Sequence, residues 1–194
     1  MSTLALVLII AAAFCHAFWN LLTKQSHGGS AFIWLFTVLG TVLYFPLALW
    51  VILTAELPSF SQFMPIVLLS AALHSLYYFA LNRGYRFGDL SLIYPLARGS
   101  APLITIAAAI ILLGEPPTAG AIGGGLLITC GVLMIAGNPF ANRSERTRKS
   151  IFYALLCGCT TAAYSVVDKV AVSSILVPPL LMDWATNAVR ALIL

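Results

Sequence analysis

The segment His-Ala-Phe-Trp-Asn-Leu-Leu-Thr-Lys at residues 16–24 decides how this chain is organised, because a related segment follows 145 positions later, at residues 161–169. The second copy reads Thr-Ala-Ala-Tyr-Ser-Val-Val-Asp-Lys. The alignment pairs residues of similar character: Ala17 with Ala162, Trp19 with Tyr164, Asn20 with Ser165, Leu22 with Val167 and Lys24 with Lys169. Both copies close an apolar run and open a short connection, so we expect them to end equivalent helices of an internal repeat.

The composition indicates that most of the chain lies in lipid. Charged residues make up 8% of the sequence and hydrophobic residues 61%, with a mean hydropathy of +0.99. A soluble domain carries about a quarter charged residues. The first apolar run does not resemble a cleavable signal peptide, because no Lys or Arg precedes it and no polar region follows. The net charge of +4 comes from a few loop residues and does not indicate a nucleic-acid partner.

Seven apolar stretches are predicted to be membrane helices. They lie at residues 3–24, 31–54, 63–82, 91–113, 118–137, 150–170 and 178–194. Each of the first six is long enough to cross the hydrocarbon core at about 1.5 Å per residue. The seventh ends with the sequence, so we expect the sequence to be truncated from a native chain of roughly 290 residues, twice the repeat.

Basic residues concentrate in alternate loops, which predicts the topology. The first, third and fifth loops hold all but one of the loop cations, namely Lys24, Arg83, Arg86, Arg143, Arg146, Arg148 and Lys149. The sixth holds Lys169. By the positive-inside rule, loops 1, 3 and 5 are expected in the cytoplasm and the N-terminus outside.

Five spans per repeat is an odd number, so the second copy must cross the membrane upside down relative to the first. The predicted fold is therefore an all-α integral membrane protein built as an inverted repeat of five-helix units. Ten spans are expected in full, of which about seven are present here. Residues 1–142 form the first unit, residues 138–149 a basic inter-repeat loop, and residues 150–194 the incomplete start of the second unit.

Two spans each carry a stripe of polar side chains four residues apart, on one helix face. The stripes are His16, Asn20 and Lys24, with Trp19 as a candidate cavity wall, and Ser70, His74, Tyr78 and Asn82. Helical rise puts both histidines and Arg98 at a common depth of about 12–14 Å, near the middle of a core about 30 Å thick. Polar groups at that depth are costly, so the stripes predict a substrate site. Taken alone, each histidine is explained equally well by a hydrogen bond to a neighbouring helix.

Arg98 is the strongest single candidate for a binding residue. It shares a stripe of the fourth span with Tyr94 and Thr105. A permanently charged guanidinium at mid-depth needs a carboxylate, backbone carbonyls, water or a substrate anion. No acidic residue of the first five spans lies at its depth, so its partner is water and carbonyls, a residue of the second repeat, or the substrate. We predict that Arg98 binds an anionic group, with the histidines contacting the same ligand or titrating beside it.

The last two spans hold further ionisable residues. Asp183, Asn187 and Arg190 share one face of the seventh span. Asp183 and Arg190 are either an ion pair that lines the same cavity, or Asp183 is the counter-ion of Arg98. Asp168 and Lys169 are interpreted as interfacial, because both lie within snorkelling reach of water.

Proline and glycine mark two further spans. Pro95, Gly99 and Pro102 loosen the fourth span and predict a helix break with free carbonyls, although proline in membrane helices is also tolerated for packing alone. A small-residue face on the fifth span predicts close helix contact, either within one chain or between two. Its members are Gly120, Gly124 and Gly131.

The sequence shows no catalytic or metal-binding pattern. It contains no His-Glu-x-x-His, no Gly-x-Ser-x-Gly and no paired intramembrane carboxylates. Cys157 and Cys159 are two residues apart on a helix and face away from each other, which disfavours both a disulfide and a metal pair. We expect no enzymatic activity, no metal and no cofactor.

Several of these segments together resemble the EamA-type members of the drug/metabolite transporter superfamily, whose full chains have ten spans in two five-helix repeats. The similar segments are residues 16–24, residues 88–102, Gly114-Glu115 and residues 162–169. The fifth span, with Gly124, Leu127, Ile128, Gly131 and Val132, resembles the packing helix of small multidrug resistance proteins. The chain departs from the family in lacking the last three helices, and in charges that put its N-terminus outside.

The sequence and the resemblance favour a secondary transporter of small polar or anionic metabolites that works by alternating access, with proton coupling as one option. The alternatives are a truncated, non-transporting subunit that needs a partner chain, or an intramembrane enzyme. The expected location is the bacterial inner membrane. The expected partners are the lipid bilayer, a small-molecule substrate and, as options, protons, a second copy or a partner chain.

Overall fold

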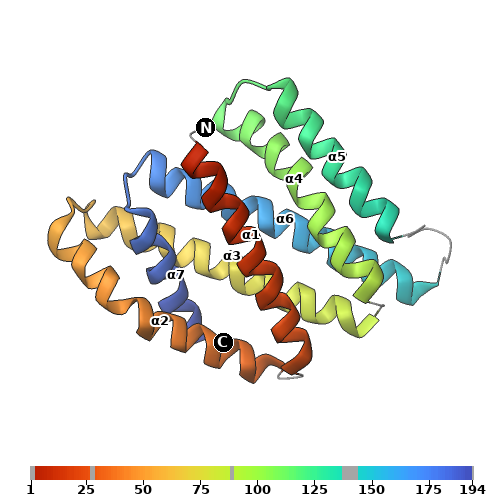
Figure 1. Ribbon diagram of the computed structural model, residues 1–194, viewed down its shortest axis with the longest axis horizontal. Helices are drawn as coiled ribbons and strands as arrows, with labels where there is room; N and C mark the ends of the chain where they lie inside the picture. Colours follow the sequence, from red (N-terminus) through yellow and green to blue (C-terminus); the bar gives the residue numbers. More distant parts are fainter. Residues whose placement is uncertain (1–2, 27–28, 88–89, 137–143, 194) are drawn as a thin grey trace.

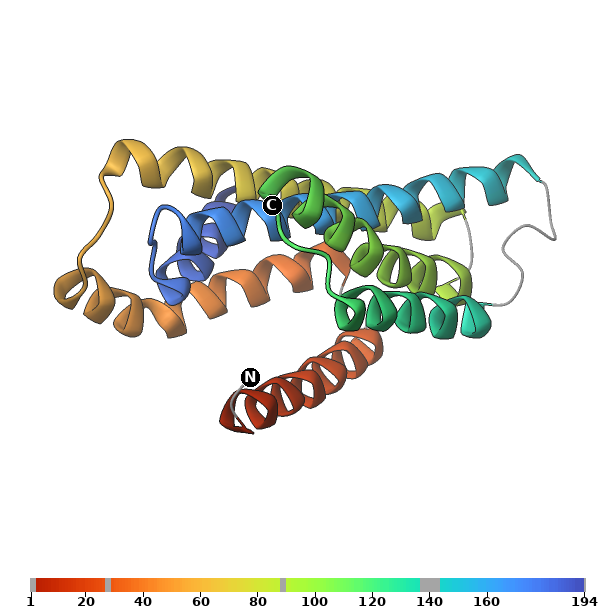
Figure 2. The same cartoon turned by 90° about the horizontal axis from the view of Figure 1, so that it is seen from above.

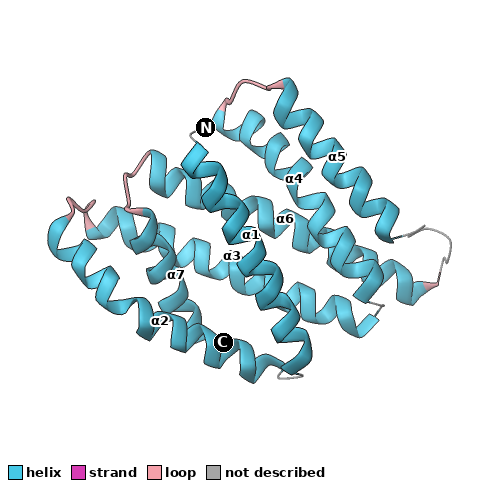
Figure 3. Ribbon diagram, in the orientation of Figure 1, coloured by secondary structure: helices cyan, strands magenta, loops and turns pink. Residues whose placement is uncertain are grey.

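Seven helices make up the part of the chain that the structure describes (Figures 1 and 3). The structure is a computed structural model that describes residues 3–26, 29–87, 90–136 and 144–193. In chain order the helices are α1 (Thr3–Ser26), α2 (Gly29–Thr54), α3 (Phe60–Phe87), α4 (Leu90–Leu113), α5 (Ala119–Ala136), α6 (Glu145–Ser173) and α7 (Pro179–Ile193). These ranges contain no strand, so the predicted all-α class is confirmed.

Several of these helices have the length and composition of membrane spans. Four of the described segments are long and apolar enough to cross a bilayer, namely Trp34–Thr54, Phe60–Phe87, Pro95–Leu113 and Glu145–Ser173. Shorter apolar helical segments cover Thr3–Cys15 and Ala119–Met134. The 15 residues of α7 extend about 22 Å at the usual helical rise. The arrangement as an inverted repeat stays a prediction.

Two helices run beyond the apolar stretches expected from the sequence. The third stretch, residues 63–82, lies within the 28 residues of α3, and the sixth, residues 150–170, within the 29 residues of α6. Hydropathy detects only the part of a helix that favours lipid, whereas a helix ends where its backbone groups find other partners. At the start of α6, the Ser144 hydroxyl accepts a hydrogen bond from the Thr147 backbone N–H at 3.1 Å. This cap starts the helix in polar sequence.

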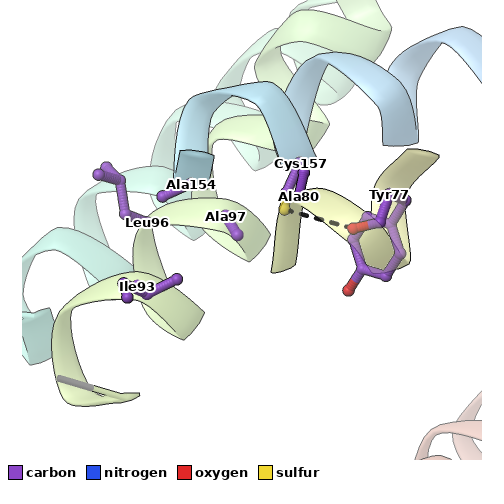
Figure 4. Packing of buried hydrophobic residues seen from close by; sticks show 7 residues of the cluster. All are labelled: Tyr77, Ala80, Ile93, Leu96, Ala97, Ala154 and Cys157. Atoms are coloured by element: carbon purple, nitrogen blue, oxygen red, sulfur yellow. Dashed lines mark hydrogen bonds between the residues drawn. The ribbon is translucent and has the colours of Figure 1, made fainter. Parts of the chain in front are cut away.

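The centre of the bundle is α6, which packs between α3 and α4 (Figure 1). Buried residues of these three helices meet there, with Tyr77 and the small Ala80 from α3, Ala97 from α4, and Ala154 and Cys157 from α6 (Figure 4). The Cys157 thiol lies 3.7 Å from the Tyr77 carbonyl oxygen, to which it donates. Small side chains let helix backbones approach closely where lipid supplies no hydrophobic drive. On the outside, α5 packs on α4, and α7 packs on α2 and α3.

Contacts at the helix ends agree with a simple up-and-down arrangement. The Arg146 Nε donates to the Phe87 carbonyl at 2.9 Å, and the Lys149 ammonium lies 5.7 Å from the centre of the Phe87 ring. The end of α3 and the start of α6, both rich in basic residues, therefore lie together. Lys169, near the end of α6, forms an ion pair with Glu115 in the connection after α4. The two connections predicted outside the membrane thus meet at the opposite end of α6.

Helix α1 stands apart from this bundle (Figure 2). Within the described ranges it packs against no other helix. Large apolar side chains along it are exposed, among them Leu4, Leu8, Phe14 and Phe18. The helix that carries the first copy of the repeated segment is therefore exposed at nearly all of its described side chains, whereas the second copy lies in the bundle centre.

Candidate functional site

Polar side chains from α3, α6 and α7 meet beside the bundle centre. The α3 stripe predicted from four-residue spacing is Ser70, His74, Tyr78 and Asn82. Its first three members face these two helices, whereas Asn82 is exposed. The His74 ring stacks on the Tyr164 ring of α6 with centroids 3.8 Å apart and planes 22° apart. The Arg190 guanidinium of α7 lies 4.9 Å from the centre of the Tyr78 ring. We call this group, with Asp168, Asp183, Thr186 and Asn187, the α3/α6/α7 polar cluster.

Hydrogen bonds join the α3 and α6 members of the cluster. The Ser70 hydroxyl is fully buried and donates to Asp168 Oδ1 at 2.5 Å. His74 Nδ1 lies 2.9 Å from the Ser70 carbonyl oxygen and 3.4 Å from the Ser70 hydroxyl oxygen. A serine with no exposed surface therefore connects a histidine on its own helix with a carboxylate on the next.

The α7 side of the cluster contains unsatisfied polar atoms. Arg190 Nη1 donates to Asn187 Oδ1 at 3.2 Å, but Arg190 Nε is buried without a hydrogen-bond partner in the described part of the chain. The same holds for the hydroxyl of Thr186, a residue that is only 5% exposed. Thr186 and Arg190 are four residues apart and so share a helix face.

The charges of Asp183 and Arg190 interact, but no salt bridge joins the two side chains in the described part of the chain. The ion pairs within the described ranges are Lys149–Glu145 and Lys169–Glu115. Asp183 is exposed, and it interacts electrostatically with Arg190, His74 and Asp168. The cluster therefore joins two carboxylates, a guanidinium and an imidazole across three helices.

Arg98 interacts electrostatically with residues next to this cluster. Its side chain is exposed on α4, and its charge acts on Tyr77 of α3 and Cys157 of α6. Tyr77 contacts both Tyr78 and Tyr164 edge-on, with ring centroids 5.4 and 6.4 Å apart. A chain of aromatic rings thus connects the neighbourhood of Arg98 with His74 and Arg190.

The side chains of four predicted site residues lie outside the part of the chain that the structure describes. His16, Trp19 and Asn20 belong to α1 and Tyr94 belongs to α4, and only their backbone is described. Their predicted contact with a substrate stays a prediction.

Tyr164, Asp168 and Thr186 are cluster members that residue spacing did not single out. The repeat alignment contained a signal for the first, since it pairs Tyr164 with Trp19, a candidate cavity wall. Asp168 was interpreted as interfacial, but it is half-buried and accepts the Ser70 hydrogen bond. Its neighbour Lys169 does reach outward, to Glu115. Adjacent residues on a helix point about 100° apart, so one faces the bundle while the other leaves it.

The predicted break in α4 is a packing site within a continuous helix. α4 runs through Pro95 and Pro102 without interruption. At Gly99 an added Cβ would lie 2.8 Å from Val132 Cβ of α5, so only glycine allows this approach. The Gly99 carbonyl also accepts a hydrogen bond from the Thr129 hydroxyl of α5 at 2.7 Å. Ligand binding by freed carbonyls stays a prediction.

Helix α5 contacts α4 through a glycine that the sequence pattern did not reveal. A Cβ on Gly125 would lie 2.7 Å from Ile106 Cδ1. The predicted packing glycines Gly120, Gly124 and Gly131 have no neighbour within 4 Å of an added Cβ in the described ranges. Contact through them with a second copy stays a prediction. No group of three or more His, Cys, Asp or Glu residues in the described ranges could hold a metal ion.

Comparison with known proteins identifies the class of this bundle. Residues 3–137 match the sequence model of the EamA-like transporter family, which covers well over half of the 194 residues. No curated protein and no solved structure matches the chain. The match, the all-helical architecture and the apolar spans agree that this is an integral membrane protein. The chain belongs to the EamA-like transporter family, within the drug/metabolite transporter superfamily.

Proposed function

We propose that this chain moves small polar or anionic metabolites across the bacterial inner membrane by alternating access. Membership of a transporter family supports the class of activity. The α3/α6/α7 polar cluster supports the position of the ligand. Alternating access would rock the two predicted five-helix units about this cluster, with the basic loops 1, 3 and 5 on the cytoplasmic side.

The observation that carries the proposal is the pair of unsatisfied groups on α7. Buried polar atoms are normally hydrogen-bonded, and in lipid an unsatisfied group is especially costly. Arg190 Nε and Thr186 Oγ1 are both donors without a partner in the described ranges. A ligand that offers acceptor oxygens to these donors, reached as the helices move, would satisfy them. The side chains therefore favour a ligand with a carboxylate, phosphate or hydroxyl group.

Two guanidinium groups bias the proposal towards anions. Arg190 is half-buried over Tyr78, and the charge of Arg98 acts on the neighbouring Tyr77. A guanidinium matches the planar, bidentate geometry of carboxylates and phosphates. We propose that Arg98 and Arg190 contact the anionic part of the ligand, while Tyr78 and the rings near it contact the rest.

The test is transport by the full protein encoded by the gene, purified and reconstituted into liposomes. The probes are a panel of radiolabelled carboxylates, phosphorylated sugars, neutral amino acids and organic cations. We expect saturable uptake of at least one polar or anionic compound, recovered chemically unchanged. Absence of uptake for the whole panel, or recovery of a modified product, would contradict the proposal.

Variants of the two arginines test the anion bias. Arg98→Gln and Arg190→Gln are each expected to lower uptake at least tenfold, because loss of one charge-assisted contact to a ligand costs about 1.5–3 kcal/mol. The matched control is Lys149→Gln, which removes a cation paired with Glu145 at the bundle end. If the Arg98 variant reaches the membrane and transports normally, Arg98 has no role in binding.

A further inference from the structure

His74 is held so that one ring nitrogen is bonded and the other is open to a proton. Its Nδ1 lies 2.9 Å from the Ser70 carbonyl oxygen, which can only accept a hydrogen bond. Nδ1 therefore carries the ring proton when the imidazole is neutral. Nε2 is then the basic atom, and it has no hydrogen-bond partner in the described part of the chain. A proton can add there without breaking a hydrogen bond within these ranges.

A hydrogen-bond chain connects the bonded nitrogen of His74 to a carboxylate. The Ser70 hydroxyl donates a hydrogen bond to Asp168 Oδ1 at 2.5 Å, so the lone pairs of its oxygen remain available to other donors. This oxygen lies 3.4 Å from His74 Nδ1. The negative charge of Asp168 thus reaches the ring through Ser70. A carboxylate linked to an imidazole in this way stabilises the imidazolium.

The charged groups that act on His74 have a net negative charge, which favours a positively charged imidazolium. Its electrostatic neighbours are Asp168 from α6 and both Asp183 and Arg190 from α7. The uncharged groups are Tyr164 of α6, stacked on the ring, and Tyr78 on its own helix. From α4, the charge of Arg98 acts on Tyr77. Among the groups whose charge acts on His74 itself, two carboxylates and one guanidinium sum to a single negative charge, which a proton on His74 cancels.

We propose that His74, supported by Ser70 and Asp168, is the proton-binding site that couples this protein to a proton gradient. The inference rests on the proposed transport function. In the step itself, hydronium on one side of the membrane gives a proton to Nε2: an O–H bond breaks, an N–H bond forms and water is left. After the helices rearrange, this N–H bond breaks and the proton passes to water on the other side, which becomes hydronium. Because Arg190 belongs to the same cluster, each step changes the field at the proposed ligand site.

The first experiment examines the histidine directly and needs no substrate. The full protein is labelled with ¹⁵N-histidine and its ring nitrogens are followed by NMR while the pH is varied. The sequence has three histidines, and the signal of His74 is the one missing from His74→Gln. We expect the neutral form to carry its proton on Nδ1, and Nε2 to take up a proton as the pH is lowered. A His74 signal that stays unchanged over the whole pH range in which the protein remains folded, or a proton on Nε2 in the neutral form, would overturn the proposal.

The second experiment connects the proton to transport. The compound that the panel identifies is followed in liposomes whose membrane potential is clamped at zero, with and without a gradient of one pH unit. If one proton moves with one ligand, this gradient supports an accumulation ratio of about tenfold at equilibrium. In His74→Gln and Asp168→Asn the ratio is expected to fall towards one.

The control is Ser165→Ala, also on α6, because the Ser165 hydroxyl bonds the Thr161 carbonyl of its own helix at 2.7 Å. Its accumulation ratio should match that of the unaltered protein. Transport with no response to the gradient, or an equal response in His74→Gln, would refute the proton site while leaving the transport function intact. If the protein transports none of the compounds, the proposed function is contradicted. Proton binding at His74 is then decided by the NMR titration alone.

Discussion

The two copies of the repeated segment lie at the ends of helices with opposite surroundings. On α1 the side chains of Phe14 and Leu8 are 73% and 60% exposed. On α6 the side chains of Ala154 and Cys157 have no exposed surface, and Ala162 within the second copy is buried as well. Similar sequence ends both helices, yet one stands apart from the bundle and the other forms its centre (Figure 2).

The residues that precede each copy account for the difference. At positions 145 apart, α1 has Ile9 and Ala13 where α6 has Ala154 and Gly158. The smaller pair lets α6 approach α4 so closely that Ser100 contacts the position of a Gly158 side chain. In lipid, close backbone approach through small residues is what holds helices together. The size of the residues along the packing face, rather than the repeated segment, therefore distinguishes the central helix α6 from the exposed helix α1.

Enlarging the aligned small residues tests this comparison most strongly. Gly158→Leu would push a side chain against Ser100 Cβ, 3.2 Å from an added Cβ, and Ile104 Cδ1, 3.4 Å away. We expect destabilisation by about 3 kcal/mol, the upper end of typical overpacking. The aligned Ala13→Leu, on exposed α1, should be nearly neutral. Each variant is heated in detergent, and the fraction of protein that stays monodisperse is measured by size-exclusion chromatography. This fraction is then compared between Gly158→Leu and Ala13→Leu. Equal losses would show that α1 is packed as tightly as α6.

Native cysteines give a second measure of the same contrast. Cys15 on α1 is exposed and Cys157 on α6 is buried. In variants that keep one of these thiols, we expect N-ethylmaleimide in detergent to react about tenfold faster or more at Cys15, because Cys157 must wait for local opening. Complete labelling of both in unfolding detergent is the control. Equal protection of Cys15 in the full protein would mean that another segment covers α1 there.

The smallest expected effect is that of Thr160→Val, which tests whether residue size or hydrogen bonding stabilises the bundle centre. Thr160 of α6 aligns with Cys15 of α1 and is 4% exposed. In the described part of the chain its hydroxyl bonds the Leu156 and Cys157 carbonyls, both of its own helix. Thr160→Val keeps the shape and leaves no orphaned donor, so we expect a change below about 1 kcal/mol in the heating assay. The aligned substitution Cys15→Val should cause no measurable change in stability in the same assay. A large loss for Thr160→Val would assign the stability of the bundle centre to hydrogen bonding instead of size.

Part of the candidate site followed from residue spacing alone. Side chains four apart on a helix must share a face, so the sequence is sufficient to group Ser70, His74 and Tyr78. The depth of Asp168 could not be judged in the same way. Its helix runs on to Ser173, beyond the apolar stretch, and its hydrogen bond to Ser70 joins residues 98 positions apart. Contacts across that separation depend on how helices pack, which local periodicity does not contain.

The all-helical membrane class, the approximate helix positions and the polar stripes follow from the order of the amino acids alone, because hydropathy and helical period depend on residues a few positions apart. Three other features depend on how the helices pack: α6 lies between α3 and α4, Tyr164 stacks on His74, and Arg190 lies over Tyr78. These outcomes depend on which helices approach one another. That choice is made by the fit of small residues such as Gly99 and Gly158 against their neighbours, a property of paired surfaces that no single segment carries.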